Sequence, residues 1–297
     1  MKTILVMTDF SVRAEHAAHY ALKLAQKVKA NLLLCNVFLG TVHEPATATP
    51  ISSYPDDYRT YEEGAIAEMA ELAARLNRQL NVDVAEGAFR PAIRYCCKGG
   101  PMIDAINDIA LTNHVLMAVI GTHHEGGLTS VLLGNHTSQV IDGANCPVLV
   151  VPYQTFFKDI KKMAFATDLG QTGVEVLHCL TGLAKHFDAE ILITHVAEEN
   201  GTDYDNQHLV KHFFNRVAAK TNYPEVYYQA IKSNSVTNGL DWLTEHTDVD
   251  MLVLIHHKRN FIKKIFERSV TQKMAANLLK PMLVFPSMEI LEALPVF

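Results

Sequence analysis

The sequence has no hydrophobic run long enough to cross a membrane and no excess of positive charge. A membrane-spanning helix needs about 20 consecutive apolar residues, and no stretch of the 297 residues approaches this length. The formal net charge is −6, whereas surfaces that bind nucleic acid or anionic lipid are usually basic. We therefore expect neither a membrane span nor a nucleic-acid partner.

Cysteine is scarce, and the five that are present form no Cys-x-x-Cys motif. The adjacent residues Cys96 and Cys97 are poorly suited to a disulfide, because neighbouring cysteines bridge only with strain. We therefore expect buried free thiols in a reducing compartment. The apolar start of the chain is interrupted by Asp9, which indicates a first strand and not a targeting segment. These observations predict a cytoplasmic protein.

Motifs of dedicated catalysis are also missing. The chain has no Gly-x-Ser-x-Gly motif and no recognisable pair of base and nucleophile. The 15 histidines include two on the first expected helix and two adjacent pairs: His16, His19, His123-His124 and His256-His257. No spacing forces three or four of them to converge, as a zinc site requires. We predict neither a metal site nor a dedicated catalytic activity.

The clearest positive feature is an internal repeat. It consists of four pairs of matching segments: KTILVMTDFS (2–11) with KMAFATDLGQ (162–171), NLLLCNV (31–37) with EILITHV (190–196), VLMAVIGTHH (115–124) with VDMLVLIHHK (249–258), and CPVLVVP (146–152) with KPMLVFP (280–286). Self-similarity on this scale indicates duplication of one structural unit. We predict two domains, residues 1–152 and 160–286, joined by a linker around 153–159. The first domain carries an insertion, which we expect to be a long surface loop at 43–58.

Within each half, expected strands alternate with expected helices. The strands are short apolar runs, which suit the buried strands of a parallel sheet; in the first half they are residues 4–8, 31–37, 115–121 and 147–151. Ser11 is a good N-cap, and alanines at helical spacing follow it. The predicted fold class is α/β, with two tandem Rossmann-like domains. Each domain is a five-stranded parallel sheet flanked by helices.

The stretch GTHHEGGLTSVLLGNHTSQVI, residues 121–141, follows an expected strand and contains four glycines. Such a loop can present several backbone N–H groups to one anion, and the helix after it adds its positive N-terminal end. A glycine-containing turn is also the ordinary way for a chain to leave a strand. The stretch by itself leaves both interpretations open.

In combination, three features resemble the universal stress protein family in its tandem form. They are the Thr-Asp after the first strand, the Asn-Val or His-Val that ends the second strand, and the late glycine loop before a Pro-Val strand. The resemblance covers nearly all of both halves and implies the adenine-nucleotide alpha hydrolase-like fold. It implies an adenine nucleotide as ligand, ATP or AMP, with Mg²⁺ alongside ATP. The nucleotide-binding positions that it implies in the first half are Thr8, Asp9, Val37, Gly121, His124, Gly134 and Asn135.

Two of these positions depart from the family's phosphate-binding pattern, Gly-x-x-Gly followed after a spacer by Gly-Ser/Thr. His124 stands where the second glycine is expected, and Asn135 stands where the hydroxyl residue is expected. Histidine and asparagine tolerate positive φ better than most residues, and the Asn135 amide can still donate a hydrogen bond to phosphate. We therefore expect an altered site that still binds.

The second half departs further, because side chains replace all three glycines of the pattern. Those positions are Ile255, Lys258 and Arg268, while the remaining candidates are Asp168, Val196 and Ser269. The basic loop 258–268 has three interpretations: a solvated helix face, an anion site that uses side-chain charge, or a contact patch. We expect the first half to be the better triphosphate site, with one ATP per chain.

The resemblance implies a cytoplasmic stress-response protein that acts as a regulatory or survival module. Nucleotide binding would order the glycine loop and thereby bias a surface that an unknown protein partner recognises. Two alternatives stay open: a nucleotide-free scaffold, in which the two halves form an intramolecular pseudo-dimer, and a weak ATPase. In the family the last strands pair across the dimer, so segments 146–152 and 280–286 are expected to pair within this chain. A further homodimer also stays open.

Overall fold

The computed structural model describes residues 1–38, 56–83, 87–122, 135–197, 203–256, 280–286 and 297. In the first half the described elements are β1 (Thr3–Met7), α1 (Val12–Val28), β2 (Asn31–Phe38), α2 (Asp56–Asp83), β3 (Ile93–Gly99), α3 (Met102–Thr112), β4 (Val115–Thr122), α4 (Asn135–Gly143) and β5 (Val148–Pro152). In the second half they are β6 (Lys162–Ala166), α5 (Gln171–Lys185), β7 (Glu190–Ala197), α6 (Asp203–Lys220), β8 (Val226–Lys232), α7 (Val236–His246), β9 (Met251–Ile255) and β10 (Met282–Phe285).

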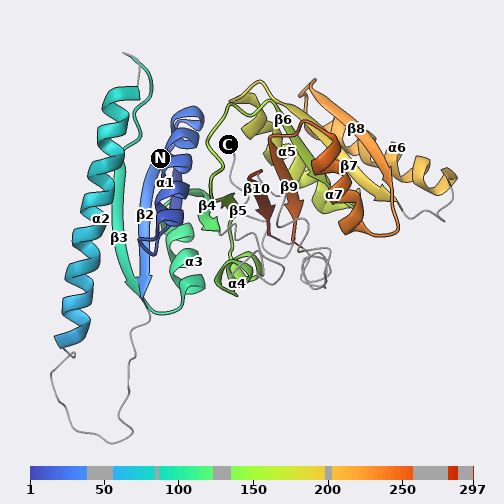
Figure 1. Ribbon diagram of the computed structural model, residues 1–297. Coiled ribbons are helices and arrows are strands. Elements are labelled where there is room, and N and C mark those ends of the chain that lie inside the picture. Colours follow the sequence, from blue (N-terminus) through green and yellow to red (C-terminus); the bar gives the residue numbers. More distant parts are fainter. Residues whose placement is uncertain (39–55, 84–86, 123–134, 198–202, 257–279, 287–296) are drawn as a thin grey trace, which may run out of the picture.

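All described strands belong to one 10-stranded sheet with the order β3-β2-β1-β4-β5-β10-β9-β6-β7-β8. Neighbouring strands are parallel within each half. The last strands of the two halves, β5 and β10, pair antiparallel at the centre (Figure 1). The predicted α/β fold and the predicted pairing of segments 146–152 and 280–286 are therefore confirmed.

Helices cover both faces of the sheet, and each face has its own hydrophobic cluster. One cluster combines the strands with apolar side chains of α1, α2, α5 and α6. The other combines them with side chains of α3, α4 and α7. Strands buried on both faces are apolar almost throughout, and β1, β5 and β9 are buried at every position.

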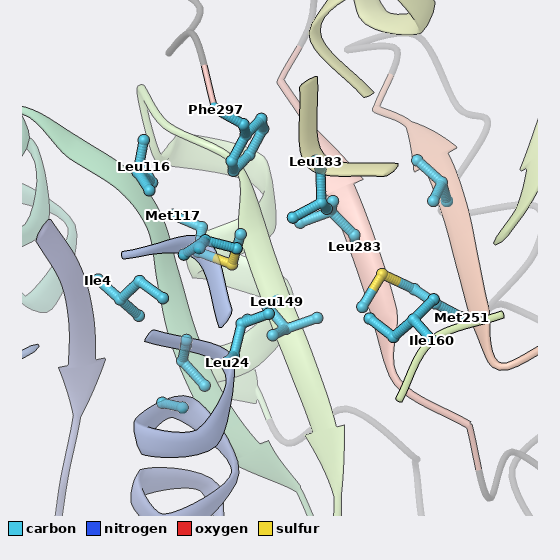
Figure 2. Packing of buried hydrophobic residues seen from close by; sticks show 14 of the residues in the cluster. Ile4, Leu24, Leu116, Met117, Leu149, Ile160, Leu183, Met251, Leu283 and Phe297 are labelled. Carbon is cyan, nitrogen blue, oxygen red and sulfur yellow. The ribbon is translucent and has the colours of Figure 1, made fainter. Parts of the chain in front are cut away.

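The two halves share a core across the central strand pair. Leu149 of β5 and Leu283 of β10 are register partners, and both side chains are fully buried. Figure 2 shows them among Met117 of the first half and Leu183 of the second, with Phe297 packed between the halves. This continuous apolar contact fits the intramolecular pseudo-dimer that the family resemblance implied.

The predicted linker, residues 153–159, is packed against α1. Phe157 makes an edge-on contact with Tyr20 at 5.1 Å between ring centroids, and Asp159 forms an ion pair with Lys27 at 2.6 Å. The predicted surface loop 43–58 needs one correction, because α2 already begins at Asp56. Residues 39–55 lie outside the described part of the chain.

Candidate functional site

The carboxyl ends of β1 and β4 form the topological switch point of the first half. From β1 the chain proceeds to β2 and β3 on one side, and β4 lies on the other side of β1. Open α/β sheets bind ligands outside the carboxyl ends of their strands at such a point. Asp9 follows β1, and Gly121 lies near the end of β4. The structure thus brings these two predicted residues to neighbouring strand ends.

The turn that carries Asp9 is fixed by its own side chains. The Thr8 hydroxyl accepts a hydrogen bond from the Phe10 N–H at 3.1 Å. The Oδ1 atom of Asp9 accepts one from the Ser11 N–H at 3.0 Å. Phe10 has a φ of 63°, and the Ser11 hydroxyl accepts from the Ala14 N–H to cap α1. Asp9 itself is exposed, so its carboxylate both shapes the turn and faces solvent.

The second half repeats the two side-chain bonds of the Thr-Asp pair, although Gly170 cannot supply the cap that Ser11 gives α1. The Thr167 hydroxyl accepts from the Leu169 N–H at 3.1 Å, and Asp168 Oδ1 accepts from the Gly170 N–H at 2.9 Å. Leu169 has a φ of 62°, within one degree of its counterpart in the first half. Two turns with the same hydrogen bonds and the same left-handed residue are structural copies, as the sequence repeat predicted.

A polar residue on the neighbouring strand supports each turn. In the first half, the side-chain amide of Asn36 donates to the Thr8 carbonyl at 2.9 Å. In the second half, Nδ1 of His195 lies 3.1 Å from the Thr167 carbonyl. In the sequence these positions stand out only as part of the motif that ends the second strand. Their supporting role was missed, because two different residue types perform it.

Asn36 has a second notable feature. The residue is 3% exposed, and among the described residues no group donates a hydrogen bond to its Oδ1 atom. A buried amide oxygen without a partner is costly, so such atoms usually mark a place for water or a ligand. Asn36 therefore offers a hydrogen-bond acceptor beside the Asp9 turn.

Gly121 has a packing role that the sequence alone does not predict. A Cβ atom added at this position would lie 2.4 Å from the Arg13 carbonyl oxygen and 3.2 Å from the Ala17 Cβ. The first turn of α1 therefore approaches β4 so closely that only glycine fits. The predicted use of its N–H group for phosphate stays a prediction.

The matching region of the second half is built differently. Ile255 is buried near the end of β9, with a side chain that is 3% exposed. Close packing there involves α5, where a Cβ on Gly173 would lie 2.4 Å from the Thr167 hydroxyl. The second switch point thus keeps the Asp168 turn but places a bulky apolar side chain on the adjacent strand.

Val37 and Val196 end their strands in matching places, and both are partly buried. Val37 is in register with Lys98 of β3. Val196 is covered by α7, because a Cβ on Gly239 would lie 2.8 Å from its side chain. The two valines are equivalent in the sequence repeat, and a glycine of α7 packs closely against the second one.

Several predicted residues cannot be placed. His123, His124, Gly134, His257, Lys258, Arg268 and Ser269, together with the basic loop 258–268, lie outside the described residues. Asn135 is the first residue of α4, so a helix begins where the glycine stretch ends, as that stretch predicted. The phosphate part of the predicted site therefore stays a prediction.

The histidines singled out in the sequence, where they are described, have structural partners. Nε2 of His16 lies 2.9 Å from the Thr155 carbonyl of the linker, and His19 contacts Gln79 and Glu15. His256 is buried and lies 3.4 Å from Asp142 of α4, so it joins the two halves. In the described part of the chain no group of three or more His, Cys, Asp or Glu side chains could hold a metal ion. Over the same residues, none of the helices has the length and apolar character of a membrane span.

The fold and the strand-end turns define an α/β protein of the Rossmann-like class with a duplicated unit. A family model described as the universal stress protein family matches residues 1–152. The chain therefore belongs to the universal stress protein family. A comparison with curated protein sequences found no match.

The first two of the following solved structures confirm the fold over both halves. A universal stress protein from Archaeoglobus fulgidus DSM 4304 is 15% identical, with 96% of this chain and 98% of that chain covered and a TM-score of 0.68. A functionally unknown protein from Pseudomonas aeruginosa PAO1 is 12% identical, with 99% and 95% covered and a TM-score of 0.54. A universal stress protein family protein from Arabidopsis thaliana with AMP bound is 16% identical, with 51% and 92% covered and a TM-score of 0.33.

Proposed function

We propose that this protein binds one adenine nucleotide, ATP or AMP, at the switch point of its first half and acts as a stress-response regulatory module. The observation that carries the proposal is the meeting of the Asp9 turn on β1 with Gly121 on β4, at the edge where open α/β sheets bind ligands. Membership of the universal stress protein family supports the same assignment.

The adenosine part of the ligand would be held by three residues. Asp9 uses Oδ1 for the Ser11 N–H, and a carboxylate has further acceptor capacity for a ribose hydroxyl or the adenine amine. The Oδ1 of Asn36 is buried, and in this proposal a small movement of the Asp9 turn exposes it as a second acceptor. Val37 supplies apolar surface at the end of β2. Together these residues present acceptors to the hydrogen-bond donors of a nucleoside.

The phosphates would lie toward the glycine stretch and the start of α4. A helix N-terminus favours anions, because its free N–H groups and its dipole both point at the ligand. His124, Gly134 and Asn135 are the proposed contacts, and Mg²⁺ would accompany ATP. In this proposal nucleotide binding orders the stretch and shifts the population of a surface that a protein partner recognises.

The two Asp turns offer a matched experiment. Asp9→Ala and Asp168→Ala each remove the side-chain bond that holds the matching turn, at 3.0 and 2.9 Å, so both variants lose the same turn contact. Only Asp9→Ala should weaken ATP binding in calorimetry, by about 1–3 kcal/mol, because it alone removes a direct ligand. The wild type should bind one ATP per chain. Equal affinity in both variants, or two equivalent sites, would contradict the assignment.

The nucleotide-free scaffold is a second candidate, favoured by the shared core at Leu149 and Leu283. Mass spectrometry of small molecules released from freshly purified protein separates the two functions. An adenine nucleotide supports the first, and its absence together with flat ATP and AMP titrations supports the scaffold. Weak ATP hydrolysis is a further proposal, tested by phosphate release above the Asp9→Ala control.

A further inference from the structure

Two cysteines face each other on neighbouring strands at the edge of the sheet. Cys35 of β2 and Cys96 of β3 are register partners in a parallel pair. Register partners on adjacent strands point to the same face and lie about 4.7–4.9 Å apart, within the roughly 4.4–6.8 Å that Cα atoms span in a disulfide. Cys97, the next residue, points to the opposite face, so the adjacent pair considered from the sequence is not the relevant one.

The two thiols differ in exposure. Cys35 is fully buried, whereas Cys96 is partly exposed on β3, which lies at the end of the strand order. This corrects the expectation of buried thiols, because Cys97 is also only partly buried. Cys96 can therefore be reached by a solute, while Cys35 is closed to solvent and lies beside Cys96.

The same contact makes the two thiols chemically unequal. The neighbouring Cys35 thiol, with a smaller contribution from the positive charge of Lys98, lowers the pKa of Cys96 to about 7. The proximity of Cys96 and burial raise the pKa of Cys35, whose thiol donates to the Asn36 carbonyl. At neutral pH Cys96 is thus substantially a thiolate, which makes it the sulfur that attacks first. Cys35 keeps its proton and serves as the second sulfur because of its position beside Cys96.

We propose that Cys96 and Cys35 form a hydroperoxide-sensitive thiol pair that closes to an intramolecular disulfide. The Cys96 thiolate attacks one oxygen of the hydroperoxide, the O–O bond breaks, and the sulfenic acid of Cys96 forms while hydroxide or alkoxide leaves. The Cys35 thiol then attacks the Cys96 sulfur and loses its proton, and water leaves as the S–S bond forms. Both sulfurs are oxidised and one hydroperoxide is reduced.

The remaining cysteines serve as internal controls. Burial raises the pKa of Cys146 and of Cys179 to about 12 each, and burial also raises the pKa of Cys97. A thiol near pKa 7 has more thiolate at neutral pH but lower intrinsic nucleophilicity, so we expect a net gain of about threefold to fivefold over an ordinary exposed thiol. Cys96 should therefore react first among the five.

The test uses the whole chain treated with about one equivalent of hydrogen peroxide per protein, followed by alkylation, non-reducing digestion and mass spectrometry. We expect loss of two thiols per chain and one cross-linked peptide pair that joins Cys35 to Cys96. The Cys97→Ser variant should give the same product. In Cys35→Ala, dimedone should trap a sulfenic acid on Cys96, and in Cys96→Ser neither product should form.

The pH dependence adds a readout that does not require a variant. Iodoacetamide labelling of Cys96 in the untreated wild type should rise as pH increases through about 7, because the thiolate forms there, and then level off. Labelling of Cys97 should still be rising at higher pH. The proposal is overturned if peroxide-treated wild type contains no Cys35–Cys96 bond, or if Cys97 is oxidised as fast as Cys96.

Discussion

At the residue scale, an asparagine and a histidine perform the same task in the two halves. Asn36 and His195 each hold the carbonyl of a strand-end threonine, at 2.9 and 3.1 Å. Both side chains have a nitrogen that reaches the same carbonyl, so the duplicated turn has kept its geometry while the supporting residue changed. What differs is chemistry toward a ligand, because the Asn36 amide also carries a buried oxygen.

This difference predicts distinct effects of two alanine variants. Asn36→Ala should lower the free energy of unfolding by about 1–3 kcal/mol, because the Thr8 carbonyl loses a buried donor. It should also weaken ATP binding. His195→Ala should cost less stability, since His195 is partly exposed, and should leave ATP affinity unchanged. Urea unfolding and calorimetry measure both; an ATP effect of equal size in the two variants would contradict the role of Asn36.

Gly121 and Gly64 give a second matched pair of variants. Gly121→Ala should destabilise the fold by about 1–3 kcal/mol, because the new methyl group would meet the Arg13 carbonyl oxygen at 2.4 Å. Gly64 lies in the exposed part of α2, and a Cβ added there would meet no atom of the described residues within 4 Å beyond its own helix turn. Gly64→Ala should therefore stabilise by about 0.5–1 kcal/mol through helix propensity. Urea denaturation measures both changes in the free energy of unfolding. A Gly121→Ala variant as stable as the wild type would show that α1 shifts away from β4 to make room for the methyl group.

At the element scale, β5 and β10 determine how the halves associate. They are the last strands of their halves, and their register places Leu149 opposite Leu283. Paired edges leave fewer exposed backbone groups for other chains. The pairing thus closes the inner edge of each half inside one molecule.

The coupling between these strands is measurable by a double-mutant cycle. Leu149→Ala and Leu283→Ala should each cost about 2–5 kcal/mol, and together they should deviate from additivity by about 0.5–3 kcal/mol, because the two side chains are in contact across the pair. Leu76→Ala in α2, which packs on β2 and β3, is the control and should be additive with Leu149→Ala. Additivity in both pairs would argue against the central contact.

The elements could be predicted from the sequence better than the contacts between them. Apolar runs such as 147–151 identify buried strands because every position in them is buried. Gly121 could not be interpreted in this way, because its role depends on where the Arg13 carbonyl lies after α1 has packed. The proximity of Cys35 and Cys96 likewise follows from strand register, which the separation along the chain does not reveal.

At the scale of the whole molecule, the shared sheet and core make the two halves one structural unit with unequal ends. The sheet runs without interruption from β3 to β8, and one hydrophobic cluster contains residues of both halves. The two switch points differ, since Gly121 lies at the first and Ile255 at the second. A ligand at the first switch point should therefore increase the stability of both halves.

This arrangement predicts that ATP stabilises the whole chain in a single transition. At a free ATP concentration of 100 times Kd, one site adds about 2.7 kcal/mol to the free energy of unfolding. Because the core crosses Leu149 and Leu283, calorimetric unfolding should show one peak that moves upward with ATP. Hydrogen exchange of the core strands should slow in both halves. In Asp9→Ala the peak should move less.

Two separate peaks would show that the halves unfold independently. Protection confined to residues 1–152 would show that the nucleotide stabilises only the half that binds it.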